Sequence, residues 1–177
     1  MYKKIIFILF YLIQNPCYGM YQQETGEENY QSSFLAKRTH VLFLCTGNSC
    51  RSQMAEVWTR HLGSDVAEVN SAGINAHGLN HNAVKVMQEM GVDITNQTSK
   101  IVNPNIIQWA DPIVTVCGDA DESCPAIPVK TKKIHWPIKD PTKVMGEEED
   151  IIKKFQVVRD EIYERVVGMI TDLREKI

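Results

Sequence analysis

Residues 40–52 read HVLFLCTGNSCRS, an apolar run followed by a polar loop. The apolar run His40–Leu44 predicts a buried strand, and the sequence QMAE after Ser52 predicts the first turn of a helix. Backbone N–H groups in such a loop, together with those at the helix N-terminus, favour a bound anion. The loop begins with the thiol of Cys45 and ends with the guanidinium of Arg51. We therefore predict a cradle for a tetrahedral oxyanion.

The residue types of this loop suit nucleophilic chemistry on an oxyanion. Arg51 carries a planar fork that binds two oxygens at once. We expect the positive field of the loop to lower the pKa of the Cys45 thiol, so that the thiolate attacks at neutral pH. The alternative, a buried cysteine near a surface arginine, is disfavoured by the Gly-Asn-Ser context between strand and helix. The predicted oxyanion-binding residues are Thr46, Gly47, Asn48, Ser49, Cys50, Arg51 and Ser52.

Composition is typical of a soluble globular domain. Of the 177 residues 44% are hydrophobic and 23% are charged, and the net charge is −3. This length suits one domain with a full core. The sequence has no basic stripe and no interleaving of basic and aromatic residues, so we expect no nucleic-acid partner.

The first residues differ from the rest of the chain. Lys3 and Lys4 precede the apolar run Ile5–Ile13, and a small residue, Gly19, follows. This pattern predicts a secretory signal peptide over residues 1–19 and export to the periplasm. A mis-assigned start, with a cytoplasmic protein, and a membrane-surface anchor are the alternatives. Residues 20–38 are polar and predict a flexible leader, which leaves 39–177 as the folded domain.

Strand-like and helix-like patterns alternate along this domain. Strands are predicted over 41–44, 66–70, 113–116 and 133–135, and helices over 49–61, 80–90, 104–109 and 147–175. The alternation predicts a small three-layer α/β sandwich with a four-stranded parallel sheet. Ligands of such folds bind beyond the carboxyl ends of the strands. The Cys45 loop, the segment Ser71–Gly73 and Cys117 all follow strands at that edge.

Two further cysteines, Cys117 and Cys124, flank a polar segment after the third strand. A permanent disulfide, two unrelated thiols and a redox relay with Cys45 are all open interpretations. The relay is the more economical one, because Cys117 lies at the same sheet edge as Cys45. A zinc site with a histidine is disfavoured by the cysteine spacing, and we predict no metal.

Asp140 precedes Pro141 in a loop after the fourth strand. A carboxylic acid near the thiolate is a candidate general acid for a departing oxygen, although Asp-Pro pairs also mark turns. His77 and His135 show no ligand spacing, and we interpret them as structural or surface residues.

With these motifs in place, the chain resembles the thioredoxin-coupled arsenate reductases, which share the fold of the low-molecular-weight protein tyrosine phosphatases. The resemblance covers roughly residues 40–175 and rests on CTGNSCRSQMAE at 45–56, NSAG at 70–73, VC at 116–117 with CP at 124–125, and HW at 135–136 with DP at 140–141. Phosphatases of this fold typically carry proline where Gln53 stands, and an aromatic residue where Thr142 stands.

The resemblance implies a relay of three thiols. Cys45 attacks arsenic while Asp140 protonates the departing hydroxyl, and Cys117 then forms a disulfide with Cys45 and releases arsenite. Cys124 next attacks Cys117, and thioredoxin reduces the resulting disulfide. No cofactor is required besides this external reductant, and a monomer is expected.

The resemblance also implies an alkali-cation site. Asn48, Glu56 and Ser71 match its ligands, but Lys100 stands where an acidic ligand is expected, so we do not assign potassium. Two other functions stay open: a phosphatase that acts through a phospho-cysteine, and an exported, non-enzymatic oxyanion-binding or thiol–disulfide protein.

Overall fold

The computed structural model describes residues 37–118 and 127–177. The predicted signal peptide, nearly all of the predicted leader, and Cys124 lie outside the described residues. The described residues contain no helix that is long and apolar enough to cross a membrane.

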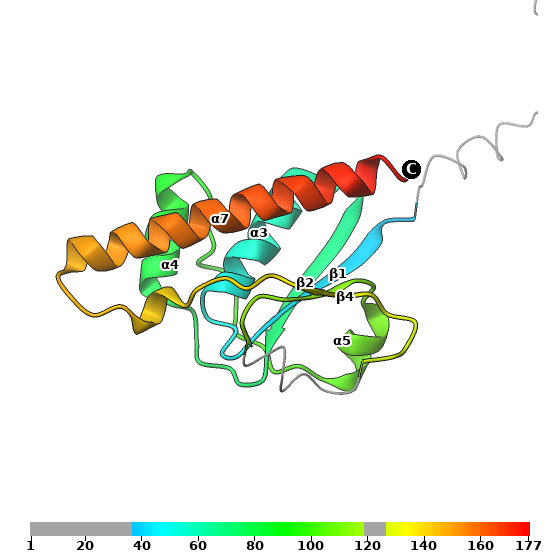
Figure 1. Cartoon of the computed structure of the whole chain (residues 1–177), viewed down its shortest axis with the longest axis horizontal. Coiled ribbons are helices and arrows are strands. Elements are labelled where there is room, and N and C mark those ends of the chain that lie inside the picture. Colours follow the sequence, from blue (N-terminus) through cyan, green and yellow to red (C-terminus); the bar gives the residue numbers. More distant parts are fainter. Residues whose placement is uncertain (1–36, 119–126) are drawn as a thin grey trace, which may run out of the picture. The chain divides into compact units, whose positions relative to one another are not determined.

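The described strands form one parallel sheet of four strands (Figure 1). They are β1 (Thr39–Cys45), β2 (Ala67–Gly73), β3 (Ile113–Thr115) and β4 (Lys133–His135), in the spatial order β2-β1-β3-β4. Leu42 pairs with Asn70 on one side and with Ile113 on the other. β1 is central and has no solvent contact from Val41 to Leu44, which explains its continuous apolar sequence.

Side chains of β1 alternate between two cores. Val41 and Phe43 pack in the larger one, with residues of α3 (Arg51–Gly63), α4 (His81–Glu89) and α7 (Glu148–Arg174). Leu42 and Leu44 pack in the smaller one, against α5 (Pro104–Trp109) on the opposite face. This two-residue alternation places helices on both faces of the sheet and confirms the predicted three-layer α/β fold.

Helix ends follow local signals. The side chains of Asn80 and Asn103 accept hydrogen bonds from backbone N–H groups in the first turns of α4 and α5. α3 begins at Arg51, two residues later than predicted, because Ser49 and Cys50 belong to the preceding loop. A single 3₁₀ turn, η1 (Pro141–Lys143), follows Asp140.

Candidate active site

Hydrogen bonds from a neighbouring segment to the carbonyl groups hold the loop from Cys45 to Cys50 in place. Four of its carbonyl oxygens accept backbone hydrogen bonds from the segment after β2: Cys45 from Ile74 (3.1 Å), Thr46 from Asn75 (2.8 Å), Gly47 from His77 (3.0 Å) and Ser49 from Asn80 (2.8 Å). In a planar trans peptide the N–H points opposite to the C=O. The amides of the loop therefore point inward, as a bound anion requires.

Asn48 holds the loop together from within. It is fully buried and adopts φ 44°, in the left-handed region that asparagine tolerates better than most residues. Its Nδ2 donates to the hydroxyls of Ser52 (3.0 Å) and Ser71 (2.8 Å), and its Oδ1 accepts from the backbone N–H of Lys100 (2.7 Å). This side chain links the loop to α3, β2 and the Lys100 segment.

The thiol of Cys45 is buried at the base of the loop. Its Sγ lies 2.9 Å from the hydroxyl of Ser52 and accepts a hydrogen bond from the backbone N–H of Asn48 (3.0 Å). Burial nevertheless raises the pKa of this thiol, and the lowering by Ser52, Asn48 and Arg51 does not offset it. The sequence prediction of a lowered pKa is therefore wrong for this pocket, because it counted the charges and omitted the loss of water.

Arg51 and Asp140 face each other across the loop. Arg51 is buried; one terminal nitrogen lies 2.9 Å from Asp140 Oδ2, and the other donates to the carbonyl of Ile138 (2.9 Å). Asp140 Oδ1 accepts from both the backbone N–H (3.0 Å) and the hydroxyl (2.7 Å) of Thr142. Thr142, interpreted from sequence only as a missing aromatic, thus orients the candidate acid.

These groups surround one pocket of about 250 Å³, here called the oxyanion pocket. Its loop side consists of Cys45, Thr46, Gly47, Ser49, Cys50 and Arg51. Asp140, Thr142 and two basic residues, His77 and Lys143, complete the lining. Of the predicted oxyanion-binding residues, Asn48 and Ser52 do not line the pocket and support the thiol from behind.

Sequence reasoning missed His77 and Lys143 as pocket residues. His77 was interpreted as structural or superficial, yet it follows β2 by four positions and so comes from the sheet edge where ligands bind. Lys143 follows Asp140 by three positions, within η1. Proximity to an edge loop was the available signal for both.

Cys117 lies next to the loop. Its buried Sγ is 3.3 Å from the hydroxyl of Thr46, and the electrostatic interaction between the two thiols contributes to the raised pKa of Cys45. Cys45, Cys50 and Cys117 are free thiols. Burial also raises the pKa of Cys50 strongly, so this loop thiol is held in its protonated form. The partner predicted for Cys117, Cys124, is outside the described part of the chain.

Glu56 is a buried carboxylate behind the loop, 3% exposed, with three cationic or hydroxyl partners. Its Oε2 accepts from Ser71 (2.5 Å) and lies 3.4 Å from the ammonium of Lys100, while Oε1 lies 2.5 Å from Arg60. Lys100 thus contacts two of the three residues that matched an alkali-cation site, Glu56 through its ammonium and Asn48 through its backbone N–H. Over residues 37–118 and 127–177, no group of three His, Cys, Asp or Glu side chains is arranged to hold a metal ion.

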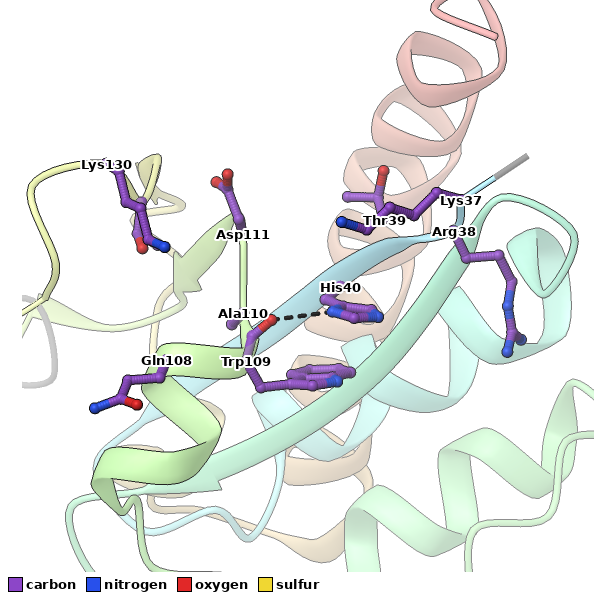
Figure 2. Close-up of a pocket in the computed structure, with 10 residues that line it drawn as sticks. Lys37, Arg38, Thr39, His40, Gln108, Trp109, Ala110, Asp111 and Lys130 are labelled. Carbon is purple, nitrogen blue, oxygen red and sulfur yellow. Dashed lines mark hydrogen bonds between the residues drawn. The ribbon is translucent and has the colours of Figure 1, made fainter. Parts of the chain in front are cut away.

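A larger cavity, of about 370 Å³, lies at the amino ends of the strands, opposite the end that carries the oxyanion pocket (Figure 2). Its lining includes Lys37, Arg38, Lys130 and Asp111, and none of the predicted catalytic residues. His40 stacks on Trp109 with ring centroids 4.5 Å apart, and His40 Nδ1 lies 3.0 Å from the Trp109 carbonyl oxygen.

The parallel sheet, the inward-facing amides and the paired thiol and guanidinium define a phosphatase-like oxyanion site on an α/β sandwich. The family model for low molecular weight phosphotyrosine protein phosphatase matches residues 40–177, and the chain belongs to this family.

Comparison with known proteins refines this placement. An arsenate reductase of Bacillus licheniformis is 56% identical over 133 residues, which span 75% of this chain and 94% of that protein. A solved arsenate reductase in a phosphate-binding state is 29% identical, with a TM-score of 0.64 over 76% of this chain and 98% of that one. A tyrosine phosphatase of Erwinia amylovora shares the fold at 18% identity, with a TM-score of 0.65 over 76% of this chain and 93% of its own.

Proposed function

We propose that the protein reduces arsenate to arsenite. The observation that carries this proposal is a buried thiol outside the loop: Cys117 Sγ lies 3.3 Å from the hydroxyl of Thr46, and ester hydrolysis would have no use for it there. The similarity to proteins named arsenate reductase, at 56% and 54% identity, supports the same substrate.

In the first step Cys45 Sγ bonds to As(V), and one hydroxyl leaves as water with a proton from Asp140. Arg51 and the loop amides hold the remaining oxygens. Asp140 lies 2.9 Å from the Arg51 guanidinium. When the oxyanion binds to this guanidinium in its place, the carboxyl of Asp140 must turn toward the leaving oxygen. Because the pKa of Cys45 is raised by burial, the thiol proton must also leave, and a bound arsenate dianion is the nearest base.

In the second step the Cys117 thiolate attacks Cys45 Sγ. The Cys45–Cys117 disulfide forms, the S–As bond breaks, and its electron pair stays on arsenic, which leaves as As(III). Cys124 then attacks Cys117, and a thioredoxin-like dithiol reduces the Cys117–Cys124 disulfide and returns the enzyme to its starting state. Two electrons pass from the external dithiol to arsenic in each cycle.

We further propose that no potassium ion is needed. The ammonium of Lys100 contacts Glu56 at 3.4 Å and Asn70 Oδ1 at 3.5 Å, where it supplies the positive charge that a cation would bring. Lys100→Met should lower activity, and added KCl should restore part of it relative to an equal concentration of tetramethylammonium chloride. A variant as active as the parent protein in potassium-free buffer would contradict this role.

The alternative activity is phosphoester hydrolysis through a phospho-cysteine, favoured by the shared Cys45, Arg51 and Asp140 and by the fold. Thr142 is bound to Asp140 and offers no aromatic wall for a phosphotyrosine ring. A third alternative is an exported, non-enzymatic oxyanion-binding or thiol–disulfide protein.

One preparation can separate these functions. Arsenate-dependent oxidation of NADPH through thioredoxin and thioredoxin reductase should occur, whereas turnover of p-nitrophenyl phosphate should be slow. Cys117→Ser should remove the first activity and spare any hydrolysis. Cys124→Ser should allow about one turnover and leave the Cys45–Cys117 bridge detectable by mass spectrometry. Steady turnover of Cys124→Ser with thioredoxin would contradict the relay.

We also propose export, with residues 1–19 removed as a signal peptide, a leader over 20–38, and a monomeric domain over 39–177. An oxidising compartment would then need a dedicated reductant for Cys117 and Cys124. N-terminal sequencing of the protein from fractionated native cells tests this, and an intact Met1 in the soluble cytoplasmic fraction would contradict export.

A further inference from the structure

Two basic side chains stand at the mouth of the oxyanion pocket and take no part in the steps above. His77 comes from the segment after β2, and Lys143 comes from η1. They therefore reach the same pocket from two separate parts of the chain. Both residues are exposed to solvent.

The backbone fixes His77 against the loop. Its N–H donates to the carbonyl of Gly47 (3.0 Å), and its ring occupies the space that a side chain on that glycine would take. A methyl group at Gly47 would lie 2.5 Å from the ring Nδ1, so no larger residue fits there without moving His77. The imidazole thus narrows the pocket and presents a titratable group to it.

Charge inside the pocket is largely balanced. Arg51 lies 2.9 Å from Asp140, and the neighbouring loop thiols of Cys45 and Cys50 are kept protonated by burial. Lys143 has no ion-pair partner among the described residues. Within the described part of the chain, the ammonium of Lys143 is therefore the unpaired positive charge that a dianion bound in the pocket would face.

We propose that His77 and Lys143 form a basic rim that selects small, multiply charged oxyanions for this site. This inference rests on the proposed function, because it assigns the site a bare oxyanion as its substrate. Charges at the edge of a site act on encounter and binding more than on bond breaking. The rim should accordingly determine the affinity for the oxyanion and the salt dependence of that affinity, without changing the rates of the chemical steps.

The test measures binding of inorganic phosphate by calorimetry, which needs no arsenate reduction and stays informative if the proposed activity fails. Lys143→Gln should weaken binding about three- to tenfold at low salt, and less at high salt, because exposed charges are screened. His77→Gln should also weaken binding at low salt, because it removes the imidazole that lines the pocket. The controls Lys153→Gln and His61→Gln remove similar groups from surfaces outside the pocket and should leave the affinity unchanged.

Kinetics then separate a rim from a catalytic role. With arsenate, both rim variants should raise KM in proportion to the weakened phosphate binding, with kcat unchanged. Equal phosphate affinities of parent and rim variants at low salt would overturn the proposal. So would a fall in kcat with unchanged affinity, or a loss of affinity of the same size in the control variants. Melting temperatures and circular dichroism establish that each variant compared is folded.

Discussion

The two cavities at opposite edges of the sheet differ in size and in chemistry. The cavity near Lys37 and Trp109 is larger, about 370 Å³ against about 250 Å³. Its charged groups are exposed, and Arg38 is already paired with Glu68 at 3.3 Å. The oxyanion pocket instead contains the buried thiol of Cys45, which is hydrogen-bonded to Ser52, and the buried guanidinium of Arg51, which is paired with Asp140. The direction of the strands, and not the size of the cavity, distinguishes the candidate active site.

The reason lies in the parallel sheet. β1, β2 and β3 all run toward one edge, so the loops after them, with Cys45, His77 and Cys117, meet there. The other edge receives the starts of the same strands, where His40 and Lys37 lie. The candidate catalytic groups come from distant parts of the chain and lie together at the carboxyl ends of the strands.

The largest expected effect comes from Cys45→Ser. An alcohol in place of the thiol cannot supply the nucleophile, and arsenate reduction should fall by at least roughly 10³-fold. The change is nearly isosteric, so phosphate binding and the circular dichroism spectrum should be retained. Activity near that of the parent protein would move the chemistry away from the oxyanion pocket.

Asp140→Asn should slow turnover by roughly 10²- to 10⁴-fold, the usual worth of a general acid. Phosphate affinity should be kept or improved, because the neutral amide, unlike the carboxylate, does not compete with phosphate for Arg51. Thr142→Ala is the matched variant, since it leaves the carboxylate in place but removes the hydroxyl that holds Oδ1. An unchanged rate and pH profile in Asp140→Asn would assign the acid to another residue.

Most of the fold follows from sequence. The apolar run of β1 and the alternation of strands and helices required both faces of a parallel sheet to be covered, as observed for Leu42 and Phe43. The start of α3 was misplaced, because the carbonyl of Ser49 bonds to Asn80, which no local pattern indicates. The raised pKa of Cys45 was missed for a similar reason: burial is set by packing of the whole domain.

His77 and Lys143 illustrate a further limit. Their chemistry was visible in the sequence, but their position depends on how the segment after β2 crosses the loop and on the turn after Asp140. By contrast, Arg51 follows the loop directly and was predictable from spacing. Arg51, Cys117 and Asp140 were proposed from motifs, whereas nothing in the local sequence indicated that His77 and Lys143 line the same pocket.

Ser52→Ala should have a smaller effect, expressed through pH. Burial raises the pKa of Cys45 above its ordinary value of 9.0, so alkylation by iodoacetamide should accelerate as the pH rises through the alkaline range. The Ser52 hydrogen bond opposes that rise, and its loss should raise the pKa further and slow alkylation at pH 8 by about tenfold. Cys50→Ser serves as background for the second loop thiol. Faster alkylation of Ser52→Ala would contradict the role of this hydroxyl.

The smallest expected effect tests the larger cavity. Lys130→Gln removes an exposed charge from its lining, and Trp109→Phe keeps an aromatic ring beside His40. Neither residue lines the oxyanion pocket. Salt also screens the interaction of an exposed charge with a remote site, so kcat and KM for arsenate should stay within about twofold of the parent values. Trp109→Phe should lower the melting temperature slightly, because Trp109 packs against the smaller core, and Lys130→Gln should not change it. A tenfold loss of activity in Lys130→Gln would show that this edge of the sheet takes part in the reaction, and strand direction would then no longer separate the two cavities.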